Sequence, residues 1–121
     1  VRWLLALSNC EDIPEVRAFS DEEKTLLEDI AANFSENDAA RIKEIERTTR
    51  HDVKAVEYFI KEKLRETSLA PVSEWVHFAC TSEDINNLSH ALMLKHGIEE
   101  VWLPRAQEMV KTVASFASEY S

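Results

Sequence analysis

The run Arg50-His51-Asp52 combines three side chains that can act on an anionic ligand or on a proton. Arg50 carries a permanent charge with forked hydrogen-bond donors, and His51 can gain or lose a proton near neutral pH. Asp52 precedes a stretch with helical apolar spacing, so the run lies where a helix is expected to begin. Such a start offers free backbone N–H groups and a positive dipole end. The combination predicts a site that holds an anion.

A second run, from His77 to Ser82, places hydroxyl groups at another expected helix start. Thr81 and Ser82 lie beside the unpaired N–H groups of that helix, and together these donors make a neutral cradle for a carboxylate. His77 precedes Thr81 by four residues, so one helical turn would bring the two side chains together. Glu83 and Asp84 count against this function, because acids also favour helix starts and would compete with an anion.

Each run also has a purely structural interpretation. Asp52 would cap a helix, Arg50 would pair with a surface acid and His51 would be an ordinary loop histidine. Thr81 and Asp84 would form a plain capping box. Such caps are common, so local grounds alone favour the structural interpretation at both places.

Other kinds of site find little support in the residues. No Cys/His cluster has zinc spacing, and a chain whose single glycine is Gly97 has no glycine-rich phosphate loop. His90 and His96 are about six positions apart, not the three or four that place two side chains on one helix face. Cys80 has no obvious activating partner, so a small buried thiol is expected there. The tryptophans are expected in the core: Trp3, Trp75 and Trp102.

Helices must position both runs, because one glycine and three prolines are too few for the frequent turns of a sheet protein. Capping boxes are expected at Ser20 with Glu23 and at Ser35 with Asp38, and Asp52 is the expected cap of a third helix. The expected helices cover residues 1–7, 21–34, 37–49, 53–66, 82–95 and 98–121, with a short helix or irregular turn over 73–80.

The last two expected helices carry most of the remaining apolar residues. Ile85, Leu88 and Leu92 form the expected buried stripe of the first of them. Gly97 either ends that helix or is tolerated inside it, and Pro104 should kink the last helix or mark its first turn. Both ends of the chain run helically without a cap or stop signal, which predicts a piece of a longer protein.

Composition limits the classes of partner. The formal net charge of −9 repels nucleic-acid phosphates, and no long Lys/Arg block occurs, so nucleic-acid binding is not expected. No apolar run approaches the length of a membrane span. Cys10 and Cys80 do not resemble a secreted disulfide framework, which favours reduced thiols and a cytoplasmic protein.

The two runs resemble motifs of one enzyme family. The segment RIKEIERTTRHDVKAVEYFIKEKL is similar to the part of bacterial adenylosuccinate lyases that carries an (Arg/Asn)-His-Asp substrate motif. The segment SEWVHFACTSEDINNLSHALML resembles the family's first shared signature region, built on Thr-Ser-x-Asp. The resemblance is continuous across the chain and includes VRWLLAL and FSENDAARIK. Two motifs in the right order outweigh the structural interpretation at both runs.

This resemblance, to a family of the fumarase/aspartase superfamily, implies an all-α fold. An N-terminal helical domain would cover residues 1–70, and the start of the central helical-bundle domain would cover 71–121. The family is homotetrameric, builds each active site from three subunits and needs no metal or organic cofactor. Its members eliminate fumarate from adenylosuccinate to give AMP, and from a succinyl-carboxamide ribotide in purine synthesis.

Carried over residue by residue, the resemblance implies substrate-binding functions for six residues. The nucleotide-side motif is Arg50, His51 and Asp52; the residues for the succinyl portion are Thr81 and Ser82; the histidine near the phosphate end is His77. Some relatives have Asn at the position of Arg50, so that contact varies.

The family's catalytic groups do not occur in these 121 residues. Its general acid lies in a Thr-His-Gly-Gln segment and its general base is a serine near Ser-Ser-x-Met-Pro-x-Lys, and neither is present. An Arg-Tyr motif is also missing. We therefore expect no catalytic residue in this chain and no turnover by it alone. Two alternatives remain: another lyase of the superfamily, or a non-catalytic acidic helical module that binds partner helices.

Overall fold

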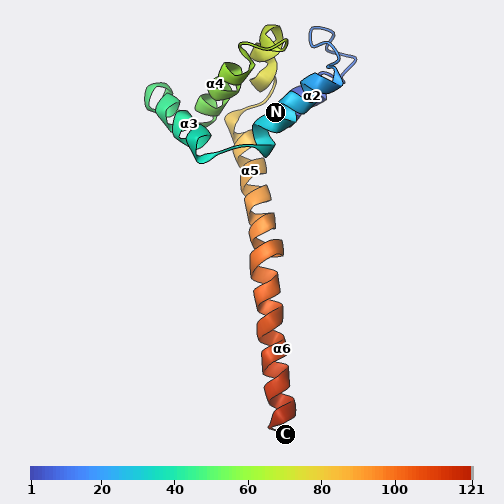
Figure 1. The fold of residues 1–121 in the computed structure, drawn as a ribbon, viewed down its shortest axis with the longest axis vertical. Coiled ribbons are helices and arrows are strands. Elements are labelled where there is room, and N and C mark those ends of the chain that lie inside the picture. The colour runs from blue at the N-terminus through green and yellow to red at the C-terminus, as the bar shows by residue number, and fades with distance from the viewer. Residues whose placement is uncertain (121) are drawn as a thin grey trace. The chain divides into compact units, whose positions relative to one another are not determined.

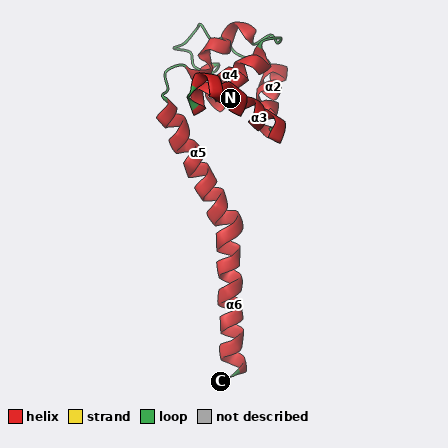
Figure 2. Cartoon of the chain, turned by 90° about the vertical axis from the view of Figure 1, so that its left-hand side faces the viewer, coloured by secondary structure: helices red, strands yellow, loops and turns green. Residues whose placement is uncertain are grey.

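The computed structural model describes residues 1–120 and is built from helices, with no strand among those residues. The order is α1 (Arg2–Leu7), α2 (Asp21–Ala32), α3 (Glu36–Thr49), α4 (Asp52–Leu64), the 3₁₀-helix η1 (Ala70–His77), α5 (Ser82–His96), the π-helix η2 (Gly97–Trp102) and α6 (Leu103–Glu119). Figures 1 and 2 show these elements from two sides. The all-α prediction is confirmed.

The chain forms two compact units, Val1–Ser82 and a second that begins at Glu83. The first unit therefore contains both runs identified in the sequence. The predicted division between residues 70 and 71 concerns domains of a larger protein, and it stays a prediction.

Both predicted capping boxes are present in the first unit. Ser20 Oγ accepts from the Glu23 N–H at 3.3 Å, and Glu23 Oε2 accepts from the Ser20 N–H at 3.0 Å. Ser35 and Asp38 repeat the arrangement at the start of α3. These reciprocal bonds satisfy N–H groups that would otherwise have no partner at the helix start, and each box is worth about 1 kcal/mol.

The core of the first unit is formed by α1, α2, α4, η1 and the loop before α2. Packing of α4 against both α3 and η1, and of α1 against α2 and η1, buries their apolar faces. The core cluster consists of Leu4, Leu7, Val16, Phe19, Leu27, Phe59, Ile60, Leu64, Leu69, Val72 and Val76. In Figure 1, α3 and α4 lie side by side, which places the start of α4 at the turn between them.

Glu23 is a buried polar centre of this core. Its carboxylate accepts two hydrogen bonds from Arg17, at 2.5 and 2.7 Å, and one from Ser68 at 2.5 Å. These bonds lower the pKa of Glu23 to about 2, with the Arg17 hydrogen bond as the largest cause. The network joins the loop before α2 to the segment after α4.

In the second unit, the described residues are helical from Glu83 to Glu119, where α6 ends. The predicted continuation of this helix to Ser121 lies outside the described residues. Gly97 does not end the helix: backbone angles at His96 and Leu103, on either side of η2, remain right-handed helical. Pro104 lies in the first turn of α6. Proline has no N–H to donate to the preceding turn, and the adjacent π-helical turn accommodates the missing bond.

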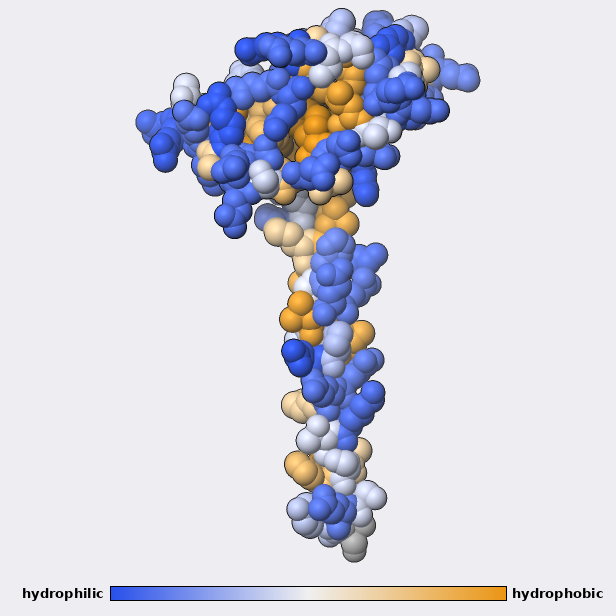
Figure 3. Space-filling model, in the orientation of Figure 1, coloured by the Kyte–Doolittle hydropathy of each residue, from blue (hydrophilic) through white to orange (hydrophobic). Residues whose placement is uncertain are grey.

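The predicted buried stripe on α5 is wrong for this chain, since Leu88 is 65% exposed and Leu92 is 51% exposed. No described residue of the second unit is buried. Figure 3 shows apolar side chains at the surface along α5, η2 and α6. The tryptophan prediction is also wrong for Trp3 and Trp102, which are 40% and 64% exposed, while Trp75 is half-buried against the core.

Candidate functional site

His51 is the N-cap of α4, where the sequence predicted Asp52. Its Nδ1 accepts a hydrogen bond from the Lys54 N–H at 3.3 Å. An imidazole is an unusual cap, and it is possible here because His51 has extended backbone angles that turn the ring over the helix start. Because Nδ1 accepts, the proton of the neutral ring lies on Nε2. The cap therefore fixes the tautomer of His51.

Asp52 is the first residue of α4 rather than its cap. Its Oδ1 accepts from the Val53 N–H at 2.7 Å and lies 3.2 Å from Nδ1 of His51. The same Nδ1 is therefore within reach of two partners, the Lys54 N–H that caps α4 and the Asp52 carboxylate. The two arrangements exclude each other, because one nitrogen cannot both accept from Lys54 and donate to Asp52.

Arg50 lies at the C-cap of α3 in the left-handed region, with φ 55°, and its N–H donates to the Glu46 carbonyl at 2.8 Å. Among residues 1–120, its guanidinium makes no ion pair, so the pairing with a surface acid that the structural interpretation required is absent there. Arg50 lines an open hollow of about 780 Å³ together with Lys43, Glu46 and Arg47. A permanent cation without a partner is suited to an anionic ligand.

Ser82 joins the second run to the first. Its Oγ lies 3.2 Å from Nε2 of His51, across 31 positions of sequence. Since Nε2 of the neutral His51 ring carries the proton, His51 donates and the Ser82 oxygen accepts. The Ser82 hydroxyl proton then remains available to a ligand. The structure thus brings together the residues at the starts of α4 and α5.

His77 is the last residue of η1, and the predicted helical turn from His77 to Thr81 is wrong. The chain is extended at Phe78, with φ −68° and ψ 137°, and left-handed at Ala79, with φ 55°. These angles match the central residues of a type II turn. Within it, Cys80 Sγ lies 3.3 Å from Nδ1 of His77. Cys80 is half-buried rather than buried.

Contacts from α1 and η1 hold this turn in place. The Trp3 indole N–H donates to the Phe78 carbonyl at 2.7 Å, across 75 positions of sequence. The rings of Trp75 and Phe78 are tilted against each other with centroids 4.5 Å apart. Ala79 is not a glycine, so its left-handed conformation costs about 1–2 kcal/mol. These contacts offset that cost.

Thr81 directly precedes Ser82, the first residue of α5, and its side chain is exposed. Both hydroxyls of the second run therefore lie at the helix start, where they were predicted. Glu83 and Asp84 occupy the same first turn of α5. Their negative charge opposes an anion there, so the donors from the first run matter for any anionic ligand.

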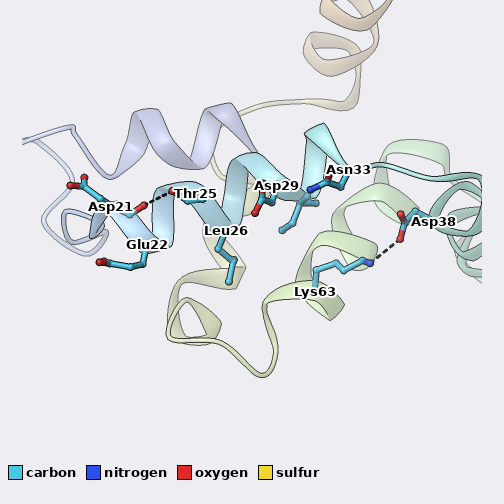
Figure 4. Close-up of a pocket in the computed structure, with 9 residues that line it drawn as sticks. Asp21, Glu22, Thr25, Leu26, Asp29, Asn33, Asp38 and Lys63 are labelled. Carbon is cyan, nitrogen blue, oxygen red and sulfur yellow. Dashed lines mark hydrogen bonds and ion pairs between the residues drawn. The ribbon is translucent and has the colours of Figure 1, made fainter.

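A hollow of about 660 Å³ lies elsewhere in the first unit, between α2, α3 and α4 (Figure 4). Asp21, Glu22 and Asp29 line it, and the Lys63 ammonium across it is paired with Asp38 at 2.8 Å. The Lys63 hydrogen bond is the largest cause that lowers the pKa of Asp38 to about 2. An acidic lining whose cation is already paired does not suit an anion.

The described residues contain no group of three or more His, Cys, Asp or Glu side chains able to hold a metal ion. None of their helices is both long enough and apolar enough to cross a membrane. Separately from these absences, the residues around the starts of α4 and α5 offer hydrogen-bond donation and positive charge.

Sequence reasoning missed three features of this site: the capping role of His51, the contact of Cys80 with His77 and the bond from Trp3 to Phe78. The first had a signal, because a histidine before an aspartate at a helix start can take the cap itself. The other two depend on a turn formed by non-glycine residues, and no local sequence pattern predicts such a turn.

Comparison with known proteins gives consistent matches over the whole chain. A family model described as lyase matches residues 2–121. The adenylosuccinate lyase of Haemophilus influenzae is 60% identical over 121 residues, which cover 99% of this chain and 26% of that protein. The adenylosuccinate lyases of Escherichia coli strain K12 and Vibrio cholerae serotype O1 are 57% and 56% identical over the same shares. The chain spans about a quarter of the length of these curated relatives.

Proposed function

We propose that this chain, which belongs to the lyase family, is part of an adenylosuccinate lyase. Such an enzyme eliminates fumarate from adenylosuccinate to leave AMP, and from the succinyl-carboxamide ribotide of purine synthesis. The identity to proteins of that name supports the proposal. The observation that carries it is the 3.2 Å contact between His51 Nε2 and Ser82 Oγ, because it joins two donor-rich helix starts at one place.

The substrate is a multiple anion, with two carboxylates and one phosphate, and the proposed contacts divide its charge among separate donors. Arg50, His51 and Asp52 bind the nucleotide side at the start of α4. Thr81 and Ser82 bind the succinyl carboxylates with their hydroxyls and the N–H groups of α5. The site must overcome a net charge of −9, which it does with a few placed donors.

His77 binds near the phosphate end of the substrate. The type II turn after η1 holds its ring against Cys80, two residues before α5 begins, and Nε2 is the nitrogen left for the phosphate. In this proposal, His51 donates from Nε2 to the Ser82 oxygen through its fixed tautomer, and the Ser82 hydroxyl donates a hydrogen bond to a carboxylate oxygen of the substrate. These hydrogen bonds orient the C–N bond that breaks in the elimination.

Elimination needs a base that removes the proton β to the leaving nitrogen and an acid that protonates this nitrogen. We propose that neither group is supplied by these 121 residues, since the two family segments that carry them do not occur in the sequence. The chain on its own is then a substrate-binding part without turnover, and it requires no metal or organic cofactor.

The complete enzyme is proposed to be a cytoplasmic homotetramer. The exposed apolar residues of α5 and α6 support an assembly in which other subunits cover them. They include Leu88, Leu92, Leu94, Met109, Val110, Val113 and Phe116, and Val101 and Trp102 of η2 are exposed as well. Nucleic acid and membrane are not proposed as partners.

The direct test measures fumarate release by the full-length enzyme that contains this chain. Adenylosuccinate, argininosuccinate and malate are compared at equal concentration. Release from adenylosuccinate alone is expected, whereas turnover of only the other substrates would move the protein to another lyase of the superfamily. Binding of partner helices through α6 without any elimination would instead support the acidic helical module, which the exposed residues of α6 also fit.

Substitutions in the full-length enzyme test the site. His51→Gln replaces a ring that bonds the Lys54 N–H and Ser82 at the same time by an amide that cannot hold both, and it is expected to lower kcat/KM at least about tenfold. The double change Thr81→Ala with Ser82→Ala is expected to raise KM for adenylosuccinate. Kinetics close to wild type for both variants would show that these groups do not bind the substrate.

A further inference from the structure

We propose that Cys80 is a positioning residue whose thiol holds Nδ1 of His77, so that Nε2 of His77 is presented to the substrate as a hydrogen-bond donor. The inference rests on the proposed function, in which His77 binds the phosphate end. It assigns a part in substrate binding to a cysteine that the motifs leave without one.

The backbone brings the two side chains together. His77 and Cys80 are the first and fourth residues of the turn whose central residues are Phe78 and Ala79, and a type II turn places its ends close to each other. Sγ of Cys80 lies 3.3 Å from Nδ1 of His77, and both side chains are half-buried. The contact is therefore built into the turn.

The turn itself is held from outside. Trp3 donates to the Phe78 carbonyl at 2.7 Å, and the Trp75 ring packs on Phe78 at 4.5 Å between centroids. Ala79 keeps a left-handed conformation that a free chain would leave. A turn fixed in this way keeps Cys80 in one position relative to His77.

The chemistry parallels that of His51. When the thiol donates to Nδ1 of His77, the neutral ring carries its proton on Nε2, as His51 does when it accepts from the Lys54 N–H. Both site histidines then carry their proton on Nε2: His51 donates it to Ser82, whose hydroxyl reaches the substrate, and His77 donates it to the substrate directly. An anion with a phosphate and two carboxylates is bound by such donors, and a ring free to change tautomer would bind it less well.

The experiment uses the full-length enzyme and four variants. Cys80→Ala and Cys80→Val remove the donor, and the valine keeps the volume in case the alanine variant does not fold. Cys80→Ser keeps a donor, and Cys10→Ala is the matched control, because Cys10 is also half-buried but lies in the loop after α1. KM and kcat for adenylosuccinate are measured together with the His77 tautomer by ¹⁵N NMR of labelled histidine.

Loss of the donor is expected to raise KM about fivefold, with kcat changed less than twofold, as for one lost hydrogen bond in binding. The serine variant and the Cys10→Ala control should stay within about twofold of wild type. The NMR spectrum should show the Nε2–H tautomer of His77 in the wild type and the serine variant, and a mixture without the donor. A donor-free variant with wild-type KM and tautomer, or a serine variant as impaired as the alanine variant, would overturn the proposal.

The two readouts separate this inference from the proposed function. A wild-type enzyme that releases no fumarate from adenylosuccinate defeats the proposed function, and the tautomer spectra then decide alone whether Cys80 positions His77. A wild-type enzyme that is active, with His77 spectra that do not respond to the loss of the thiol, defeats only the inference.

Discussion

Leu27 and Leu88 both lie on apolar stripes of amphipathic helices, yet Leu27 is 0% exposed and Leu88 is 65% exposed. In the first unit, the stripes of α2, α4 and η1 face one another and α1, so each covers the others. In the second unit, α5 and α6 follow each other along one helical path and have no neighbour within the unit. The same periodicity thus gives a core in one region and an open surface in the other.

Amphipathic spacing thus shows which face of a helix is to be buried, but it does not show which other element buries that face. In the first unit, the apolar faces of the helices are buried by other helices within about eighty residues, because the turns reverse the chain repeatedly. The second unit contains no such reversal: Gly97 stays helical, and Pro104 lies in a helical first turn beside η2. Its apolar side chains can be covered only by residues outside it.

Truncation of a core residue is the strongest test of this contrast. Leu27→Ala in the 121-residue chain is expected to lower the free energy of unfolding by about 2–5 kcal/mol, because it leaves a cavity in a packed core. The matched change Leu88→Ala on the exposed face of α5 should change it by less than about 0.5 kcal/mol. Urea unfolding followed by circular dichroism measures both. Equal effects would mean that the two leucines are buried alike in solution.

Acid is expected to act on the first unit next most strongly. In the folded protein, the pKa values of Glu23 and Asp38 are about 2, below those of free carboxyl groups. At any pH above the pKa of the free groups, both carboxylates therefore stabilise the fold. This stability is lost as the pH falls through the folded-state values. Urea midpoints between pH 7 and pH 2 should therefore decline. The variant Glu23→Gln should be less stable at pH 7 and should show a flatter decline; an unchanged pH dependence would exclude Glu23 as a source.

Removal of a helix cap should have a smaller effect. Ser20→Ala removes the hydroxyl that accepts from the Glu23 N–H and should cost about 1 kcal/mol. Ser115→Ala in α6 is the control, since its hydroxyl bonds the Thr112 carbonyl within an exposed helix. A change close to zero is expected there. The urea midpoints of the two variants measure both changes in stability. A Ser20→Ala variant as stable as the Ser115→Ala control would count against the capping box.

The smallest expected effect concerns the turn beside the site. Ala79→Gly removes the steric strain of an alanine in the left-handed region, but glycine also loses more backbone entropy on folding. The balance should stabilise the first unit by about 0.5–1 kcal/mol. Ala114→Gly in α6 should instead weaken its helix by about 1 kcal/mol, because that residue is helical. Thermal melts show the sign of each change. A loss of stability in Ala79→Gly would mean that the turn is not strained in solution.

Much of the first unit could be predicted from particular residues. Ser20 with Glu23 and Ser35 with Asp38 predicted the starts of α2 and α3, because side-chain caps are local interactions between residues three apart. The start of α4 was predicted one residue late, since His51 and Asp52 can both cap and only the observed backbone angles of His51 distinguish them. The turn at Phe78 and Ala79 could not be predicted, because an alanine carries no local preference for it.

The sequence by itself determined the helical class, the capping boxes and the two polar runs, since each depends on residues within about one helical turn of one another. Only the tertiary structure decided that His51 meets Ser82, that Trp3 holds Phe78, and that Leu27 is buried while Leu88 is not. These contacts join residues far apart in the chain, and they exist only where turns and packed neighbours bring helices together. The helical period of the apolar residues shows which face must be buried, and only tertiary packing shows what buries it.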